Sequence, residues 1–152
     1  MSHNLLKAFL ILTFALLGQG ICGNSITSLG PYQLGSTISQ VKDVGYTVKL
    51  TQPENYFKNS IYEVVINEAH ITLFFSEGLL KSIIMKIEES SYQEYLEGQQ
   101  DFLQTFRKRP DVNDKPGVIP QYVTIWWHDV GTIFSLNYDP KSYTIYMSLM
   151  IR

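Results

Sequence analysis

The side chains that could act as acids, bases or metal ligands are few and widely separated along this sequence. After the first few residues the histidines are His70 and His128, and neither has another histidine or a cysteine at ligand spacing. His128 is followed by Asp129, but neighbours in a strand point to opposite faces, so the two are not aligned as a base and its orienting carboxylate. We therefore predict no catalytic residue, no metal site and no cofactor.

Two adjacent tryptophans, Trp126 and Trp127, are the sharpest remaining feature. Since alternate residues of a strand face opposite ways, the two rings cannot lie in one core layer. We expect Trp126 on the second face of a sheet, together with Tyr122, His128 and Tyr146. An exposed patch of aromatic rings usually serves binding, so these four residues are the predicted binding site.

The second face has an alternative interpretation, in which it is covered rather than exposed. The short first helix, the loop over 53–60 or a second copy of the chain could cover it. In that case the rings would be a second core and not a contact surface.

Three strands near the end of the chain would position this surface. They are predicted over 121–129, 131–138 and 142–151, and their short connections force antiparallel pairing. The predicted core face carries Val123, Ile125, Trp127, Phe134, Leu136, Ile145, Met147 and Leu149. The opposite face would carry Tyr122, Thr124, Trp126, His128, Ser135, Asn137, Thr144, Tyr146 and Ser148.

A hairpin over 70–75 and 79–88 is the clearest local unit of the sequence. Its strands are joined across Ser76, Glu77 and Gly78, and a glycine that tolerates positive φ favours such a turn. The first core candidates are Ile71, Leu73, Phe75, Ile83, Met85 and Ile87.

The main helix is predicted after this hairpin. Ser91 and Glu94 have the spacing of a capping box, and Pro110 stops the helix. Its apolar side includes Tyr92, Tyr95 and Leu96, and can lie on a sheet. Gly98 weakens the helix by about 1 kcal/mol relative to alanine.

The earlier elements are a short helix and two strands. Ser36 is expected to cap the helix, which carries Ile38, Val41 and Val44 on one face and ends at Gly45. The strands are predicted over 46–50 and 61–67. The fold class is therefore α+β: a mainly antiparallel sheet of five to six strands, with one main helix packed on one face and a short N-terminal helix.

The first 20 residues have the pattern of a cleavable signal peptide. Lys7 precedes an uncharged apolar run of about ten residues, which is too short to span a bilayer. We predict a signal peptide over 1–20, a lead-in over 21–33 and one domain over 34–152, with no transmembrane segment after cleavage. Cys22 is the only cysteine, so the domain forms no internal disulfide; lipid attachment at Cys22 is the alternative to a free mature N-terminus.

The number and distribution of charged residues indicate that nucleic acid is not a partner. The chain has 12 basic and 14 acidic residues, spread without a basic face, whereas phosphate backbones demand clustered cations. Aromatic residues make up 13%, which supplies core material for an exported domain without bridges.

Two segments carry a resemblance to a known family. Residues 32–37 open a short helix, and residues 126–138 run from Trp126 through Gly131 to Tyr138. Together they resemble the beta-lactamase-inhibitor-protein-like group of exported bacterial domains. The resemblance implies binding of another protein through sheet and loop surfaces.

Three functions follow as hypotheses. The first is an exported, periplasmic or extracellular, non-enzymatic protein-binding or inhibitor-like module. The second is a small-ligand carrier or enzyme with a pocket between helix and sheet, using His128, Asp129 or Tyr138. The third is a structural envelope protein, either a homodimer or a lipoprotein anchored at Cys22.

Overall fold

The computed structural model describes residues 27–98, 123–129 and 131–152, with 123–129 described through their backbone. The predicted signal peptide, Cys22 and Tyr122 lie outside these residues, as does the predicted helix beyond residue 98. The labelled elements of these residues are β1 (Ser28–Leu29), β2 (Tyr32–Gln33), α2 (Ile38–Asp43), β3 (Lys49–Gln52), β4 (Asn59–Ile66), β5 (Ala69–Ser76), β6 (Leu79–Glu88), β7 (Val123–Asp129), β8 (Thr132–Asp139) and β9 (Thr144–Ile151).

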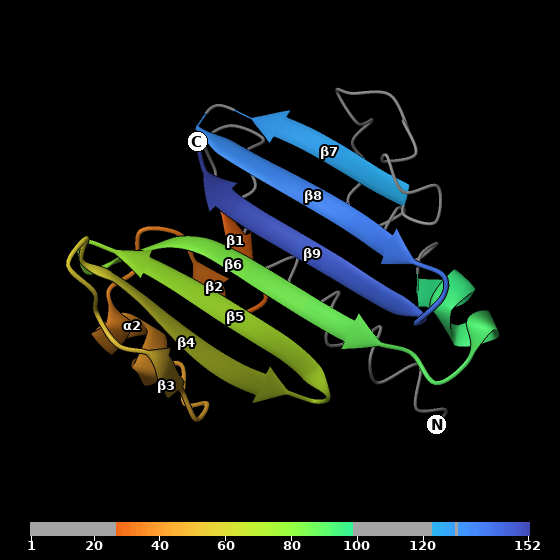
Figure 1. Ribbon diagram of the computed structural model, residues 1–152, viewed down its shortest axis with the longest axis horizontal. Coiled ribbons are helices and arrows are strands. Elements are labelled where there is room, and N and C mark those ends of the chain that lie inside the picture. Colours follow the sequence, from red (N-terminus) through yellow and green to blue (C-terminus); the bar gives the residue numbers. More distant parts are fainter. Residues whose placement is uncertain (1–26, 99–122, 130) are drawn as a thin grey trace.

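One antiparallel sheet of seven strands dominates the fold, in the order β3-β4-β5-β6-β9-β8-β7 (Figure 1). The prediction of five to six strands was therefore too low. β3 is an edge strand that overlaps the strand predicted over 46–50 but begins three residues later. All four of its residues are exposed, whereas the sequence pattern predicted a half-buried strand. β6 and β9 lie beside each other at the centre of the sheet, and each belongs to a run of antiparallel neighbours.

The tight turns explain why the strands pair with their chain neighbours. Asn67 and Glu68 join β4 to β5 with φ of 45° and 73°, and Glu77 and Gly78 join β5 to β6 with φ of 54° and 77°. Positive φ at both central residues is the geometry whose twist matches that of the flanking strands. The predicted hairpin is confirmed, and all six of its core candidates are buried.

The core lies on one side of the sheet. Its sheet members include Leu73, Ile83, Leu136 and Leu149, which have no exposed surface. The predicted core residues of the last two strands are confirmed as buried: Phe134, Leu136, Ile145, Met147 and Leu149. Period-two alternation thus identified this face correctly in β5, β6, β8 and β9.

The elements outside the sheet cover this same side. Leu29, Tyr32, Val41 and Tyr95 belong to the cluster formed by the core face of the sheet. Figure 1 shows α2, β1 and β2 behind the sheet. Residues 28–33, which the sequence analysis assigned to a lead-in, therefore form a hairpin that packs into the core.

The cap of α2 differs by one residue from the prediction. Thr37, and not Ser36, is the N-cap: its hydroxyl accepts a hydrogen bond from the Gln40 amide at 3.4 Å, and the Gln40 side chain accepts one from the Thr37 amide at 2.8 Å. Both exposed amides are thereby satisfied. Val44 is exposed rather than core-facing, because α2 ends at Asp43 and the chain turns away at Gly45.

A second helix begins at residue 92, where the sequence predicted it. Ser91 accepts a hydrogen bond from the Glu94 amide at 3.3 Å, but the Glu94 carboxylate accepts from Ser90 rather than Ser91. Tyr95 is buried, whereas Tyr92, expected on the apolar side, is 53% exposed because its ring lies at the margin, against Tyr95 and Tyr143.

Gly98 lets this helix approach the sheet closely. A Cβ at this position would lie 3.1 Å from Cδ1 of Ile145, so the glycine has a packing role that the sequence analysis missed. The described residues thus form a mainly antiparallel sheet with few helices, in agreement with the α+β class.

Candidate functional site: the open face of the sheet

The side of the sheet opposite the core is called the open face here and is made of three rows of residues paired across the strands. Opposed residues of neighbouring strands project to the same side, so each row is a set of lateral neighbours. The first row is His70, Lys86, Tyr146 and Asn137; the second is Thr72, Ile84, Ser148 and Ser135; the third is Phe74, Ser82, Met150 and Ile133.

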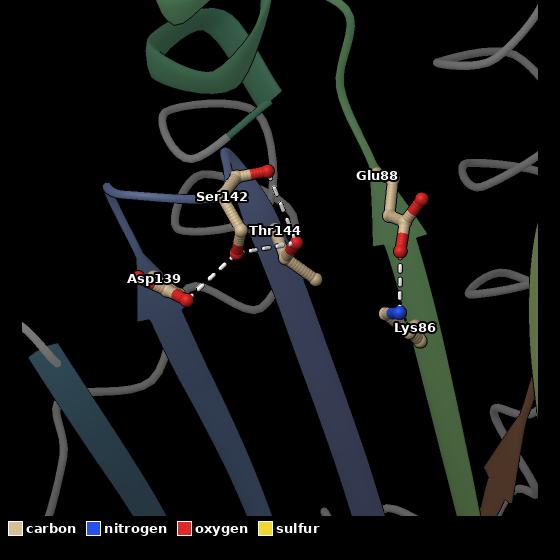
Figure 2. Close-up of polar contacts among 5 residues, drawn as sticks. All are labelled: Lys86, Glu88, Asp139, Ser142 and Thr144. Atoms are coloured by element: carbon tan, nitrogen blue, oxygen red, sulfur yellow. Dashed lines mark hydrogen bonds and ion pairs between the residues drawn. The ribbon is translucent and has the colours of Figure 1, made fainter.

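The first row forms a charged and polar margin. The Lys86 ammonium donates to the Glu88 carboxylate two residues along the same strand (Figure 2). This hydrogen bond raises the pKa of Lys86 and lowers the pKa of Glu88, and His70 adds to the second effect. The side chains of both partners are well exposed, so the pair orders the surface more than it stabilises the fold.

The second row contains a hydrogen-bonded polar group between β8 and β9. The hydroxyl oxygens of Ser135 and Ser148 lie 2.6 Å apart, and the Asn137 amide donates to Ser135 at 3.2 Å. Ser135 is 1% exposed, so its hydroxyl needs a protein partner and has one. This group fixes the side chains at the centre of the open face.

The third row is mainly apolar, with Ser82 as its polar member. Phe74, Ile133 and Met150 are each half-buried, and Ile84 of the second row and Ile61 of β4 are half-buried too. No charged residue lies in this row as the register gives it. Half-buried apolar side chains spread over several strands form a stripe that a second surface can complete.

The β8–β9 turn holds a polar cluster that serves the fold. The Ser142 hydroxyl donates to the Asp139 carboxylate at 2.7 Å and lies 2.8 Å from the hydroxyl oxygen of Thr144 (Figure 2). The Lys141 amide also donates to Asp139, at 3.0 Å. The hydrogen bond from Ser142 is the main cause of the lowered pKa of Asp139. A carboxylate held in its charged form by local donors stabilises a turn and is a poor proton acceptor.

Tyr143 follows in this turn with a φ of 51°, which is unusual for an aromatic residue. Its ring centroid lies 5.9 Å from that of Tyr92 and 6.2 Å from that of Tyr95. The Tyr143 carbonyl also accepts a hydrogen bond from the Glu89 amide at 2.9 Å. The start of the second helix is therefore fastened to the β8–β9 turn, on the core side.

The histidines are far apart in the sheet. His70 lies on β5 and His128 on β7, with β6, β9 and β8 between them. Asp129 is paired with Thr132, next to the turn after β7. Over residues 27–98 and 131–152, no group of three or more histidine, cysteine and acidic side chains is placed to bind a metal ion. The helices described there also include none with the length and apolar character needed to cross a membrane.

The predicted site residues can now be placed individually. Tyr146 is half-buried on the open face, between Lys86 and Asn137. The backbone register sets Trp126 opposite Ser135 and His128 opposite Ile133. Tyr122 lies outside the described residues.

Sequence reasoning missed the part of the open face contributed by β5 and β6. Phe74 and Ile84 adjoin the core residues Phe75 and Ile83, so both faces of these strands are apolar and the alternation is blurred. The signal that could have found them is the same period-two rule, applied to the residues left over after the core was assigned.

The covers considered for the second face can be compared with the structure. Val41 of α2 packs into the core cluster, so this helix covers the opposite side. The loop before β4 adjoins only the end of the open face, where it borders a hollow together with Ile61 and Phe74. The second hypothesis placed Tyr138 in a ligand pocket between helix and sheet. Its side chain has no exposed surface, and its ring packs against that of Tyr95.

Comparison of the chain with protein families, with curated proteins and with solved structures gave no match.

Proposed function

We propose that this chain is an exported, non-enzymatic module that binds another protein through its open face. The observation that carries the proposal is the composition of that face: an apolar stripe, a hydrogen-bonded serine and asparagine group, and a charged margin lie side by side. Protein interfaces combine apolar surface with polar groups that can form hydrogen bonds, and this face offers both side by side.

The charges of the open face favour a protein over a nucleic acid. Lys86 is paired with Glu88, and Glu63 of β4 is exposed in register with Thr72. Cations that bind phosphates must be in excess and clustered, and the described side chains of this face show no such excess. A nearly neutral face with aliphatic and aromatic side chains is suited to a protein surface.

The four residues proposed for binding are Tyr122, Trp126, His128 and Tyr146. Tyr146 has the strongest support, because it is half-buried at the boundary between the charged margin and the serine group. Trp126 enters the proposal through its register with Ser135 and Ser148. A tryptophan in that row would supply the large buried ring that often dominates binding energy.

Export is the second part of the proposal and rests on residues 1–20. The charged start and apolar run of this segment are those of a signal peptide. Mass spectrometry of the protein from the native host should give an N-terminus near residue 21. An intact Met1, or acylation at Cys22, would contradict the soluble exported form.

The binding proposal is tested by affinity capture from an extract of the native host's cell envelope. We expect Tyr146→Ala and Trp126→Ala each to lower recovery of a specific partner at least about fivefold, as removal of a central aromatic contact does. Tyr46→Ala is the matched control, since Tyr46 is an exposed tyrosine in the segment before β3. Equal recovery with all three variants, or a partner that is only a second copy of the chain, would contradict the proposal.

A further inference from the structure

A hollow of about 370 Å³ lies at the end of the open face. It is found where β4 begins, β5 ends and β6 begins. Its lining residues are Gln52, Asn55, Asn59, Ser60, Ile61, Phe74, Phe75, Ser76 and Lys81. Its volume is in the lower part of the range of about 300–1,000 Å³ in which small organic ligands bind.

Two β-bulges shape this hollow. The pairing of β3 with β4 shifts between Leu50 and Gln52, which leaves Thr51 as an extra residue. The pairing of β5 with β6 shifts at Phe74 and Phe75, which are paired with Ser82 and Leu80, so Lys81 is the extra residue there. Bulges redirect side chains and are frequent beside binding sites, and here one of them delivers Lys81 to the lining.

The loop that forms one wall is held by its own hydrogen bonds. The Asn55 side-chain oxygen accepts from the amides of Phe57 and Asn59, at 2.9 Å and 3.1 Å. The Lys58 amide donates to the Asn55 carbonyl at 2.9 Å, and the Lys58 carbonyl accepts from the Glu77 amide at 3.0 Å. The wall is therefore formed before any ligand arrives, which lowers the entropic cost of binding.

The lining offers three kinds of contact. Ile61, Phe74 and Phe75 supply apolar surface. Gln52 and Asn59 supply side-chain amides that can donate and accept, and Asn55, whose side-chain oxygen already accepts two hydrogen bonds, supplies its amide nitrogen as a donor. Lys81 supplies a cation. Within residues 27–98 and 131–152, Lys81 forms no ion pair, in contrast to Lys86, whose ammonium is paired with Glu88.

We propose that this hollow binds the C-terminal residue of a peptide chain that ends in an apolar side chain. The terminal carboxylate pairs with Lys81, the peptide groups hydrogen-bond to the amide wall, and the apolar side chain lies on Phe74. A fatty acid shares the carboxylate and the apolar body but has no use for the amides, so these groups favour a peptide. The inference goes beyond the proposed function, because the hollow would bind a free peptide whether or not the open face binds a protein.

The test is an NMR titration of the full chain with N-acetyl-phenylalanine, which ends in a carboxylate, and with its amide, which does not. We expect the acid to shift the resonances of Asn59, Phe74 and Lys81 and to bind about two- to fivefold more tightly than the amide, as one partly exposed ion pair allows. Lys81→Gln should remove this preference and Lys81→Arg should keep it. Lys86→Gln, on the same strand but already paired, is the matched control and should also keep it.

Three results would overturn the proposal. The first is equal affinity for acid and amide in the unaltered chain, or no shift with either compound. The second is a loss of preference in Lys86→Gln as large as that in Lys81→Gln. The third is tighter binding of octanoate than of N-acetyl-phenylalanine, which would identify the hollow as a fatty-acid site.

Discussion

The two faces of the sheet are made from alternate residues of the same strands, yet they differ in almost every physical respect. Leu73 and Leu149 have no exposed surface, while their neighbours Thr72 and Ser148 are half-buried and polar. One face is covered by α2, by the β1–β2 hairpin and by the start of the second helix, which all join one cluster. The difference shows that parity along a strand separates the residues that form the core from the more polar residues of the opposite face.

The largest expected effect compares adjacent residues of β5. Leu73→Ala should lower the free energy of unfolding by about 2–5 kcal/mol, since it leaves a cavity in the core. Thr72→Ala, one residue away on the open face, should change it by less than about 1 kcal/mol. Urea denaturation of the two variants measures both values. Similar losses in both would remove the distinction between the faces.

Alkaline conditions should act through the core face. Burial is the main cause of the raised pKa values of three tyrosines of the core. The pKa is raised to about 12 for Tyr32 and Tyr95, and the pKa of Tyr138 is raised more than these two. An unfolded tyrosine ionises near 10, so the stabilisation is complete below that pH and is lost as the pH rises towards the folded values. Urea denaturation at a series of pH values should show stability falling above about pH 10. A flat profile to about pH 12 would contradict this reasoning.

Tyr138→Phe tests how one buried tyrosine hydroxyl of the core face contributes to stability. The Tyr138 hydroxyl is buried without a hydrogen-bond partner among the described residues, so its removal takes away an unsatisfied group. We expect the free energy of unfolding at neutral pH to stay within about 1 kcal/mol of its original value or to rise. Part of the loss at alkaline pH should disappear. A loss comparable to that of Leu73→Ala would instead reveal a hydrogen bond to this hydroxyl.

The smallest expected effect concerns the turn after β8. Because the pKa of Asp139 is lowered, chiefly by Ser142, the carboxylate contributes stability above its unfolded pKa that is lost as the pH falls through the folded value. Ser142→Ala should raise this pKa towards its ordinary value of 3.8 and weaken the loss of stability in acid. NMR titration of the carboxyl carbon measures the shift. An unchanged pKa would mean that the backbone donors alone hold the carboxylate.

Much of the fold could be predicted where strands pair with their neighbours in the sequence across short turns. β5 and β6 alternate apolar and other residues over a turn that contains Gly78, so pairing, register and core face all follow from neighbouring residues. The same holds for β8 and β9, with their short turn. The start of the second helix was also predicted correctly, because Ser91 and Glu94 have the spacing of a helix cap.

The features that sequence reasoning missed depend on contacts between distant segments. Leu29 and Tyr32 lie in a stretch rich in serine and glycine, and only the packing of this hairpin near Met85 shows them to be core residues. The bulge at Lys81 has no local signature, since it becomes visible only in the pairing with β5. The hollow that it helps to form could not be predicted for the same reason.

The candidate site lies between these two cases. Tyr146 was correctly assigned to the face opposite Met147, because the alternation in β9 is regular. Phe74 and Ile84 were not assigned to a site, since apolar residues on both faces of β5 and β6 conceal which of them are fully buried.

The most direct test of the central claim is photo-crosslinking from the open face. Benzoylphenylalanine is introduced in place of Tyr146 and, as the control away from this face, in place of Tyr46, and the proteins are irradiated in the native host. The account predicts a crosslink to a distinct protein from position 146 and none from position 46. Equal crosslinking from both positions, or none from position 146, would show that the open face is not the binding surface.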